Sequence, residues 1–495
     1  MKKLKLSLVV PNYRWNNDDP HTYWTYLPYG YTLLAAMVED ICDVEIIDSY
    51  LEDMTQEEVS NILKKNKPDV VGITCLMDAH GNTGHDVAKI AKKVLPNVTT
   101  LYGGVYVTMN PKIVSEDKNV DYVVVGEGEY VLKNLIEYFL GKSELPEKGI
   151  IYRKNGKLID TGRADFIPSL DVIPRPAYHL VPFERYSGFL PRAKTIGRPP
   201  KLPYVRMLTS RGCPYECSFC QVEEITGHKF RAKSAKAVLD EIEWLRDEWG
   251  VKSLVFADDN FFLNMKRVRE IFEGFIERNI NMPWIAEDAS VWTFTREILE
   301  LLAKTGCQYL GFAIESGTKR VLDEIVQGKP IDFNQTKETI DICRELGIYT
   351  SANYIIGFPT ETWDEIRETL RMAEWLNSDY TRIFAAVPLK NTKLWDLTEA
   401  AGAFKDGYDH FGGASSWSAG QIETSEFTAN DLTLLRAYEW DRINFSSEEK
   451  RKKTAKIIGI SQEELADVRR NTLAESITKL DGNYKGYNYD GFVHQ

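Results

Sequence analysis

Short apolar runs alternate with amphipathic segments over the first third of the chain. Five runs rich in Val, Ile, Leu and Tyr predict strands, at residues 4–10, 44–48, 69–75, 98–102 and 122–125. The remaining segments predict helices, around residues 28–37, 57–65, 86–94 and 130–140. Nearly continuous apolar strands that alternate with helices indicate a parallel sheet covered on both faces.

This pattern predicts an α/β domain of the doubly wound, flavodoxin-like (Rossmann-type) class over residues 1–142. Such sheets bind ligands beyond the carboxyl ends of their strands. Glycine at those ends permits positive φ and close backbone approach. A single glycine after a strand is usually only a turn, but several at one edge indicate a ligand site. The candidate residues are Asn12, Tyr13, Thr74, Cys75, Gly103, Gly104, Gly126, Glu127 and Gly128.

Residues 143–203 have little periodicity and are interrupted by prolines, among them Pro168, Pro174 and Pro176. A short apolar stretch at 150–152 suggests a hairpin-like piece within this segment. Spaced prolines without a repeating apolar pattern are typical of a connector. We therefore predict a linker between two domains.

Six strand–helix repeats begin at residue 204. The predicted strands lie at residues 204–210, 253–260, 284–288, 309–317, 349–359 and 382–388. Polar residues end most of them, and function in TIM-type barrels is located at that face. We predict a partial (β/α)6 TIM-type barrel over residues 204–395. A mainly helical C-terminal domain follows over residues 396–495, with a glycine-rich loop at 411–417 that could cover a substrate.

Composition and charge narrow the class of protein. The chain has 495 residues, of which 43% are hydrophobic and 27% charged, as in ordinary globular proteins. Its net charge of −12 argues against bulk nucleic acid as a partner. The sequence contains no apolar run long enough to span a bilayer, and the first residues read as a strand rather than a signal peptide. We expect a cytoplasmic protein without a transmembrane segment.

Three of the seven cysteines lie within eight residues, at Cys213, Cys217 and Cys220. Cysteine thiolates are the usual ligands of iron–sulfur clusters, and three on one loop can hold three corners of a cube. The nearest candidate for a fourth ligand, Cys307, lies far along the chain. The motif therefore predicts a 4Fe-4S cluster with one open iron, which can bind a substrate or cofactor directly.

Zinc is the alternative metal. A structural zinc site requires four ligands, and the loop lacks a second cysteine pair; His228 is the only histidine nearby. Ordinary buried cysteines are a third interpretation. Clustered cysteines in odd number favour a cofactor site in a reducing compartment over a disulfide framework.

The cysteine loop and the strand ends before it carry a resemblance to a known family. A flavodoxin-like domain with Tyr102-Gly-Gly-Val-Tyr and Gly126-Glu-Gly-Glu, followed by Cys-x3-Cys-x2-Cys, is similar to the cobalamin-binding radical S-adenosylmethionine (SAM) enzymes, class B-type methyltransferases included. The resemblance extends to about residue 400. It implies three cofactors: a 4Fe-4S cluster, SAM and cobalamin.

The resemblance also implies roles for residues by motif position. Cys213, Cys217 and Cys220 resemble the cluster ligands, whose open iron chelates SAM before reductive cleavage to a 5′-deoxyadenosyl radical. Glu315 resembles the carboxylate that accepts hydrogen bonds from the ribose hydroxyls. Either of the two aspartates at 258 and 259 could point inward. The implied SAM-binding residues are Phe219, Arg231, Ser234, Asp258, Asp259, Glu315, Ser351, Asn353 and Gly357.

The sequence departs from related families in two motifs, and each departure restricts the functions it can have. The Asp-x-His-x-x-Gly loop that supplies an axial histidine to cobalt is absent after the first strand, and we interpret His80 and His85 as surface or pocket histidines rather than axial ligands. Methylthiotransferases need three cysteines in the N-terminal domain, which has only Cys42 and Cys75. The remaining cysteines, Cys307 and Cys343, sit in predicted helical contexts, and we interpret them as structural.

We therefore predict a radical SAM enzyme with cobalamin as second cofactor. The reaction it implies is methylation of an unactivated carbon or phosphorus centre in a small molecule, lipid or peptide. A cobalamin-dependent cyclase or rearrangement enzyme is one alternative, and a non-catalytic iron–sulfur redox or scaffold protein is another. A one-electron reductant of flavodoxin or ferredoxin type is the implied partner, and the sequence does not specify the substrate.

Overall fold

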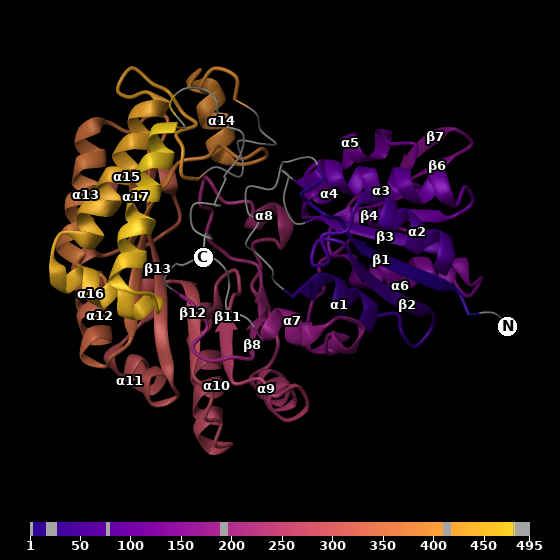
Figure 1. Cartoon of the computed structure of the whole chain (residues 1–495), viewed down its shortest axis with the longest axis horizontal. Helices are drawn as coiled ribbons and strands as arrows, with labels where there is room; N and C mark the ends of the chain where they lie inside the picture. Colours follow the sequence, from indigo (N-terminus) through magenta and orange to yellow (C-terminus); the bar gives the residue numbers. More distant parts are fainter. Residues whose placement is uncertain are drawn as a thin grey trace. The chain divides into compact units, whose positions relative to one another are not determined.

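The computed structural model describes residues 3–15, 27–75, 80–188, 197–408, 417–478 and 480. The chain divides into two compact units (Figure 1). Unit 1 comprises Met1–Tyr186 with Glu224–Thr226, and unit 2 comprises Ser187–Glu223 with Gly227–Gln495. Part of the predicted linker, residues 143–186, thus belongs to unit 1.

Unit 1 is built on a seven-stranded sheet of order β2-β1-β3-β4-β5-β6-β7. The first five strands are parallel, and β6 and β7 form an antiparallel hairpin at the edge next to β5. The strands are β1 (Lys5–Val10), β2 (Asp43–Asp48), β3 (Val70–Cys75), β4 (Thr99–Gly104), β5 (Tyr122–Val124), β6 (Ile150–Lys154) and β7 (Lys157–Asp160). The parallel order 2-1-3-4-5 is that of flavodoxin-like folds, which confirms the predicted class.

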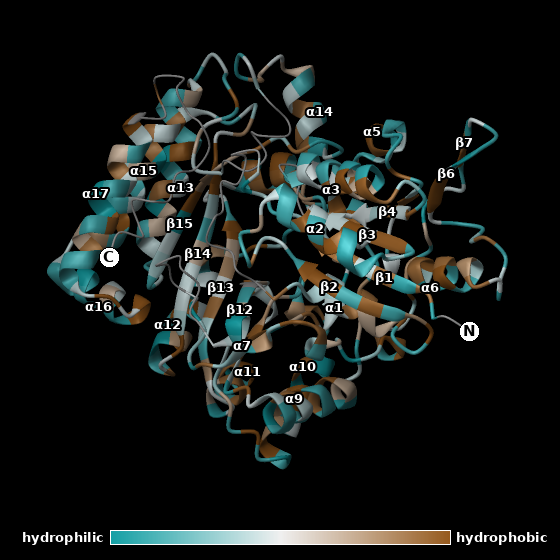
Figure 2. Cartoon of the chain, turned by 45° about the vertical axis from the view of Figure 1, so that its right-hand side comes forward, coloured by the Kyte–Doolittle hydropathy of each residue, from teal (hydrophilic) through white to brown (hydrophobic). Residues whose placement is uncertain are grey.

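Helices cover both faces of this sheet: α1 and α6 pack together, and α2 packs with α3 (Figure 1). They are α1 (Tyr29–Ala36), α2 (Gln56–Asn66), α3 (Gly81–Val94), α4 (Val105–Met109), α5 (Pro111–Glu116), α6 (Gly128–Phe139) and α7 (Phe183–Ser187). Helix α2 begins with a capping box, in which Thr55 and Glu58 satisfy each other's backbone N–H groups. In Figure 2 strands β1 and β3 are largely hydrophobic, whereas the helices carry both hydrophilic and hydrophobic residues.

Unit 2 contains a six-stranded parallel sheet of order β15-β14-β13-β12-β11-β8. Its strands are β8 (Tyr204–Met207), β11 (Ser253–Phe256), β12 (Trp284–Ala289), β13 (Cys307–Glu315), β14 (Tyr349–Ile356) and β15 (Tyr380–Ala385). The intervening helices are α8 (Val222–Ile225), α9 (Ala235–Trp249), α10 (Met265–Glu277), α11 (Arg296–Lys304), α12 (Phe333–Glu345), α13 (Trp363–Leu376) and α14 (Lys393–Ala400). Six parallel strands with helices between them confirm the predicted partial barrel.

Aromatic rings fill part of the barrel core. Phe272 stacks on Trp284 with ring centroids 4.4 Å apart, and Phe256 meets both rings edge-on. All three side chains are at most 1% exposed. Buried aromatic residues contribute large apolar areas, so this cluster gives the strand ends a rigid base.

Three helices follow the barrel, as predicted: α15 (Ala429–Phe445), α16 (Glu448–Ile458) and α17 (Gln462–Thr478). Helix α15 lies along β15, the strand at the end of the six-stranded sheet. The side-chain amide of Asn444 accepts a hydrogen bond from the N–H of Thr381 at 2.7 Å and donates one to its carbonyl at 2.8 Å. A helix side chain thus takes the place of a neighbouring strand at this point.

Among the residues that the structure describes, no helix is long and apolar enough to cross a membrane. The predicted glycine-rich covering loop at 411–417 lies outside the described residues except for Trp417.

Candidate functional site

The cysteine loop begins where β8 ends and is held between two short antiparallel strands, β9 (Ser210–Arg211) and β10 (Arg231–Ala232). Gly212 has a φ of 86°, and a Cβ there would lie 2.4 Å from the carbonyl oxygen of Lys229. Only glycine fits such a close approach at positive φ. The N–H of Cys213 then bonds to the carbonyl of Gly227 at 3.2 Å. The entry to the loop is therefore fixed by backbone contacts.

The rest of the loop is docked on two helical segments that follow other strands of the barrel. The N–H of Ser218 donates to the carbonyl of Val326 at 2.8 Å, and the N–H of Leu394 donates to the carbonyl of Ser218 at 2.7 Å. A Cβ at Gly328 would lie 2.8 Å from the backbone nitrogen of Glu216, so this glycine allows the two segments to touch. The loop is thus positioned by the segments that follow β13 and β15.

The three thiols of the loop are half-buried and interact electrostatically with one another. Burial raises the pKa of all three, that of Cys217 to about 12. In the ligand-free protein they are therefore neutral, and binding of a cluster, which requires thiolates, must release their protons. Among the described residues no three His, Cys, Asp or Glu side chains converge as the ligands of one metal ion.

Glu315 ends β13 and is adjacent to the cysteine loop. Its φ is +69°, in the left-handed region that non-glycine residues seldom occupy, and the pairing with β14 shifts register there. Such strain is found where the surrounding structure imposes it, often at functional sites. Glu315 is 5% exposed. A buried carboxylate in an imposed conformation at a strand end is suited to a fixed ligand contact.

Lys329 forms an ion pair with Glu315, and its side chain is only 11% exposed. Its ammonium also lies 5.9 Å from the centre of the Phe219 ring, within the range of a cation–π contact. Burial acts to lower the pKa of Lys329, but Glu315 and Cys217 together raise it. The lysine is therefore charged, and it connects the predicted ribose ligand to the cysteine loop.

Asp258 and Asp259, at the end of β11, both hold the entry to the cysteine loop. One oxygen of Asp258 accepts hydrogen bonds from the N–H and hydroxyl of Thr209, each at 2.8 Å, and from the hydroxyl of Ser210 at 2.6 Å. Asp259 accepts one from the N–H of Gly212 at 2.8 Å. The sequence suggested contacts to SAM; the structure engages both carboxylates with the chain itself.

Strand β14 brings Gly357 and Phe358 to the same rim. Gly357 has a φ of 86°, and a Cβ there would lie 2.3 Å from the side chain of Leu432 in α15. The ring of Phe358 lies 6.5 Å from that of Phe219. Gly357 is thus required by packing against the C-terminal helices, whereas the next residue approaches the cysteine loop.

Four other predicted SAM contacts lie in varied surroundings. Ser351 is buried in the first half of β14, where its hydroxyl bonds to that of Tyr309 at 2.6 Å, and Asn353 lies two residues nearer the carboxyl end. Ser234 caps α9 by accepting a hydrogen bond from the N–H of Ala237. Arg231 is buried in β10. The contacts of Ser351 and Ser234 are with the protein.

Glu361 is a buried carboxyl that belongs to no motif recognised in the sequence. It is 1% exposed, and one of its oxygens accepts hydrogen bonds from the N–H groups of Gly357 at 2.6 Å and Phe358 at 3.1 Å. Its other oxygen has no hydrogen-bond partner among the described residues. Burial raises the pKa of Glu361 from 4.5 to about 8. The Glu361 carboxyl is therefore mostly neutral at pH 7, and in that form it holds the turn after β14.

This raised pKa predicts a pH-dependent stability. The neutral Glu361 carboxyl makes its full contribution to the free energy of unfolding below about pH 4.5. That contribution is lost as the pH rises to about 8, because the Glu361 carboxyl ionises at a lower pH in the unfolded chain than in the folded one. The loss amounts to about 1.4 kcal/mol per pH unit within that window. Glu361→Gln keeps an acceptor oxygen but cannot ionise, so urea unfolding at pH 5 and pH 8 should show a smaller decline for the variant than for the wild type.

Glu365 is the matched control for this experiment. Hydrogen bonds from Arg320 lower the pKa of Glu365 to about 2, so it is ionised in both states throughout the same pH window. Glu365→Gln should change stability equally at both pH values. Parallel pH profiles for the wild type and Glu361→Gln would contradict the assigned role of Glu361.

In unit 1 the predicted cobalamin-site residues lie at the carboxyl ends of β1, β3, β4 and β5. Thr74 and Cys75 of β3 pair with Gly103 and Gly104 of β4. Gly104 has a φ of 96°, and a Cβ there would lie 2.1 Å from the hydroxyl oxygen of Thr74. Burial raises the pKa of Cys75 to about 12, and the Tyr102 hydroxyl donates to its sulfur at 3.2 Å. At this edge the small residues are required by contacts between strands.

The loop after β1 is anchored by Asn12, which donates to Asp53 at 3.0 Å and to the carbonyl of Met54 at 3.1 Å. Tyr13 stacks on the buried His80 with ring centroids 3.9 Å apart. His85, by contrast, pairs with Asp117 at 2.7 Å. Tyr13 and His80 thus form a stacked aromatic pair, called the aromatic step below, near the carboxyl ends of β1 and β3.

The loop after β5 contains Gly126, Glu127 and Gly128. Gly126 has a φ of 97°, and its N–H donates to the hydroxyl of Thr108 at 3.0 Å. Glu127 accepts a hydrogen bond from the N–H of Ile167 at 2.7 Å. Gly128 begins α6. This loop therefore also owes its conformation to hydrogen bonds with neighbouring segments of unit 1.

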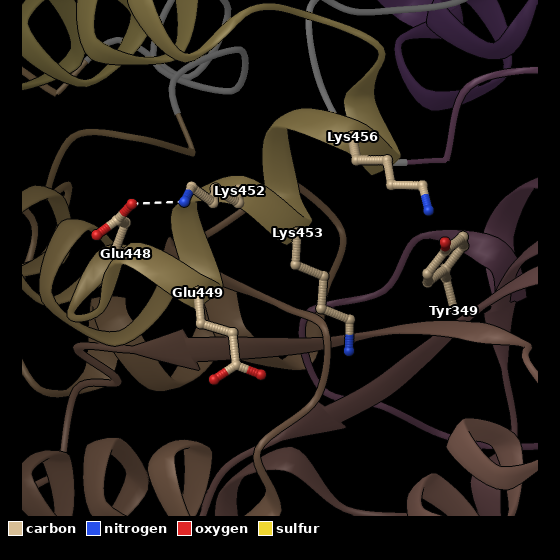
Figure 3. Close-up of a pocket in the computed structure, with 6 residues that line it drawn as sticks. All are labelled: Tyr349, Glu448, Glu449, Lys452, Lys453 and Lys456. Carbon is tan, nitrogen blue, oxygen red and sulfur yellow. Dashed lines mark ion pairs between the residues drawn. The ribbon is translucent and has the colours of Figure 1, made fainter.

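A surface pocket of about 700 Å³ lies elsewhere in unit 2 (Figure 3). The pocket is lined by Tyr349, at the start of β14, and by five side chains of α16: Glu448, Glu449, Lys452, Lys453 and Lys456. Lys452 pairs with Glu448 at 2.6 Å, and Lys453 pairs with Asp379. This pocket is at the amino end of a strand whose carboxyl end carries Gly357, so it is separate from the cysteine-loop rim.

Sequence reasoning missed Lys329, Glu361 and Asn260 at the rim. The Asn260 amide lies 3.9 Å from the sulfur of Cys213 and donates to the hydroxyl of Ser290 at 2.7 Å. Asn260 follows the two aspartates directly, which was an available signal. Lys329 and Glu361 follow a glycine and a proline turn and resemble ordinary surface residues in the sequence.

Comparisons with known proteins identify the two parts of the chain that contain these residues. A model of the radical SAM superfamily matches residues 207–373, and one of the B12 binding domain matches residues 23–136. The chain is 35% identical over 404 residues to an uncharacterized methyltransferase, PH0819, of Pyrococcus horikoshii, covering 81% of this chain and 84% of that protein. It is 29% identical over 420 residues to the cytidylyl-2-hydroxyethylphosphonate methyltransferase of Streptomyces wedmorensis, covering 74% and 77%.

Among solved structures, the cobalamin-dependent S-adenosylmethionine radical enzyme OxsB, with aqua-cobalamin and S-adenosylmethionine bound, aligns with a TM-score of 0.71. The alignment covers 97% of this chain and 75% of that one at 16% sequence identity. At this identity the likeness establishes a shared fold.

Proposed function

The chain belongs to the B12-binding radical SAM family, and on this premise we propose that it is a methyltransferase acting on an unactivated carbon or phosphorus centre. The family uses a 4Fe-4S cluster, SAM and cobalamin. The observation that carries the proposal is the three-thiol loop at the barrel rim, beside a strained and buried carboxylate at Glu315. Two relatives that it matches over most of their length carry methyltransferase names, which favours methyl transfer over cyclisation.

The residues at the rim fit these cofactors. Cys213, Cys217 and Cys220 would hold the cluster, because their thiols share one loop. When bound, the cluster supplies the electron that cleaves SAM, and cobalamin carries the methyl group. Glu315 would accept hydrogen bonds from the ribose hydroxyls of SAM, and Phe219 would pack beside its adenine. Asp258 and Asp259 keep the loop entry in place for those contacts.

In unit 1 the aromatic step of Tyr13 and His80 and the backbone of Gly103, Gly104 and Gly126 would receive the corrinoid. Close backbone approach at these glycines suits a large flat ligand. A cytoplasmic one-electron reductant of flavodoxin or ferredoxin type would supply electrons to the cluster. The methyl acceptor would be a small molecule, a lipid or a peptide.

The test is anaerobic reconstitution with iron, sulfide and cobalamin, followed by incubation with dithionite as the one-electron reductant, trideuteromethyl-SAM and an extract of cells that lack the protein. We expect 5′-deoxyadenosine together with a product that carries the labelled methyl group. Cleavage of SAM without transfer of the labelled methyl group would contradict methylation and favour a cyclase or rearrangement enzyme. Retention of a cluster without corrinoid would refute the role of cobalamin.

A further inference from the structure

Lys329 occupies a central place at the rim, although no motif pointed to it. Its position is set by the backbone, because Gly328 packs against the backbone of Glu216 and the carbonyl of Val326 binds the N–H of Ser218. The segment that carries the lysine is therefore docked on the cysteine loop itself. The ammonium pairs with Glu315 and lies over Phe219.

The geometry places this ion pair beside the cysteine loop. The segment that leads to Lys329 contacts both neighbours of Cys217 along the chain: Gly328 packs on the backbone of Glu216, and the carbonyl of Val326 binds the N–H of Ser218. The Lys329 ammonium lies 5.9 Å from the ring of Phe219, the residue that directly precedes Cys220. The loop thus experiences one buried cation and one buried anion, which are paired with each other.

A cluster held by three thiolates gains a further negative charge when it is reduced. Reduction potentials of such clusters depend on nearby charge and on solvent exposure. A cation at 11% exposure is screened far less than one at the surface. It therefore favours the reduced, more negative form, and a buried anion disfavours it.

We propose that Lys329 and Glu315 form a charge-balancing pair that sets the reduction potential of the cluster bound by the cysteine loop. This inference rests on the proposed function, since it requires the cluster. Lys329 is a positioning residue: it holds Glu315 in place and offsets its charge next to three thiolates. With the pair intact, a carboxylate needed for the ribose hydroxyls can stand beside the cluster without making its reduction harder.

The test is a redox titration of the reconstituted full chain in the absence of SAM, followed by electron paramagnetic resonance of the reduced cluster. Lys329→Gln should shift the midpoint potential to more negative values, and Glu315→Gln should shift it to more positive values. The double variant should return close to the wild type, because the pair has no net charge. Lys329→Arg should keep the wild-type potential.

Lys319→Gln is the matched control, because Lys319 forms an exposed ion pair with Asp323 at 3.0 Å in the segment after β13. Its removal should leave the potential unchanged. In samples that contain the cluster, the inference would be overturned if Lys329→Gln and Glu315→Gln shifted the midpoint potential in the same direction or left it unchanged. A wild-type protein that binds no iron would instead overturn the proposed function, so iron content is measured in every sample.

If Lys329→Gln fails to fold, the comparison of Glu315→Gln with the double variant still decides. Adding Lys329→Gln to Glu315→Gln should shift the potential to more negative values. Equal potentials for these two proteins would refute the charge effect of the lysine.

Discussion

Replacement of Cys217 by alanine is expected to abolish cluster binding and all cleavage of SAM. Three thiolates hold three corners of the cube, and the loss of one leaves two irons without a protein ligand. Cys217 also lies within the part of the loop docked on Val326, so no other described cysteine can replace it without a rearrangement of that segment. Iron content, visible absorption and chromatography of 5′-deoxyadenosine after anaerobic reconstitution measure the effect.

Cys343→Ala is the matched control, because Cys343 is a buried residue of α12 and burial raises its pKa to about 12. Its thiol therefore behaves as a small apolar group. This variant should retain iron and SAM cleavage. Cleavage at wild-type rate by Cys217→Ala would show that the loop does not hold the cluster.

Replacement of Asp258 by alanine is expected to cause the largest loss of stability at the rim. Three buried donors, the N–H and hydroxyl of Thr209 and the hydroxyl of Ser210, would lose their shared acceptor. Arg267, which also donates to the Thr209 hydroxyl at 2.8 Å, would lose the nearby negative charge. Leaving buried donors and a buried cation uncompensated costs about 3–5 kcal/mol. Urea unfolding of the cluster-free protein, followed by tryptophan fluorescence, measures the change.

Asp259→Ala provides the comparison, since Asp259 is half-buried and accepts a hydrogen bond from the N–H of Gly212, whereas Asp258 is buried and accepts three. One such bond contributes about 1 kcal/mol. The ratio of the two losses tests the different roles of the neighbouring carboxylates. Equal losses for the two variants would show that the Asp258 network is not a main support of the loop.

The layout of both sheets could be predicted because it depends on apolar periodicity. The strands of unit 1 were predicted within a few residues, and β1–β5 have the expected parallel order. Continuous β-branched runs are unambiguous when helices separate them. The resemblance to the family rested on the glycine-containing strand ends of unit 1 together with the cysteine spacing, and the comparisons confirm it.

Other features depend on contacts that no local pattern reveals. Cys307 was placed in a helical context, and this was wrong: it begins β13, because α11 ends at Lys304 and Gly306 at a φ of 91° turns the chain into the strand. Helices α4 and α5 were not predicted, since they are short and follow β4 without a loop. The different hydrogen-bond partners of Asp258 and Asp259 arise from the approach of β8, a long-range contact.

The hydrogen bonds of Asn444 to the backbone of Thr381 have a practical consequence for dissection of the molecule. An uncovered edge strand offers its free N–H and C=O groups to other chains, and folded proteins cover such edges to avoid association. A version trimmed before α15 would expose β15 and leave Gly357 without the side chain of Leu432 that packs on it. Such a version would form aggregates, and the smallest catalytic core that can be isolated from unit 2 includes its C-terminal helices.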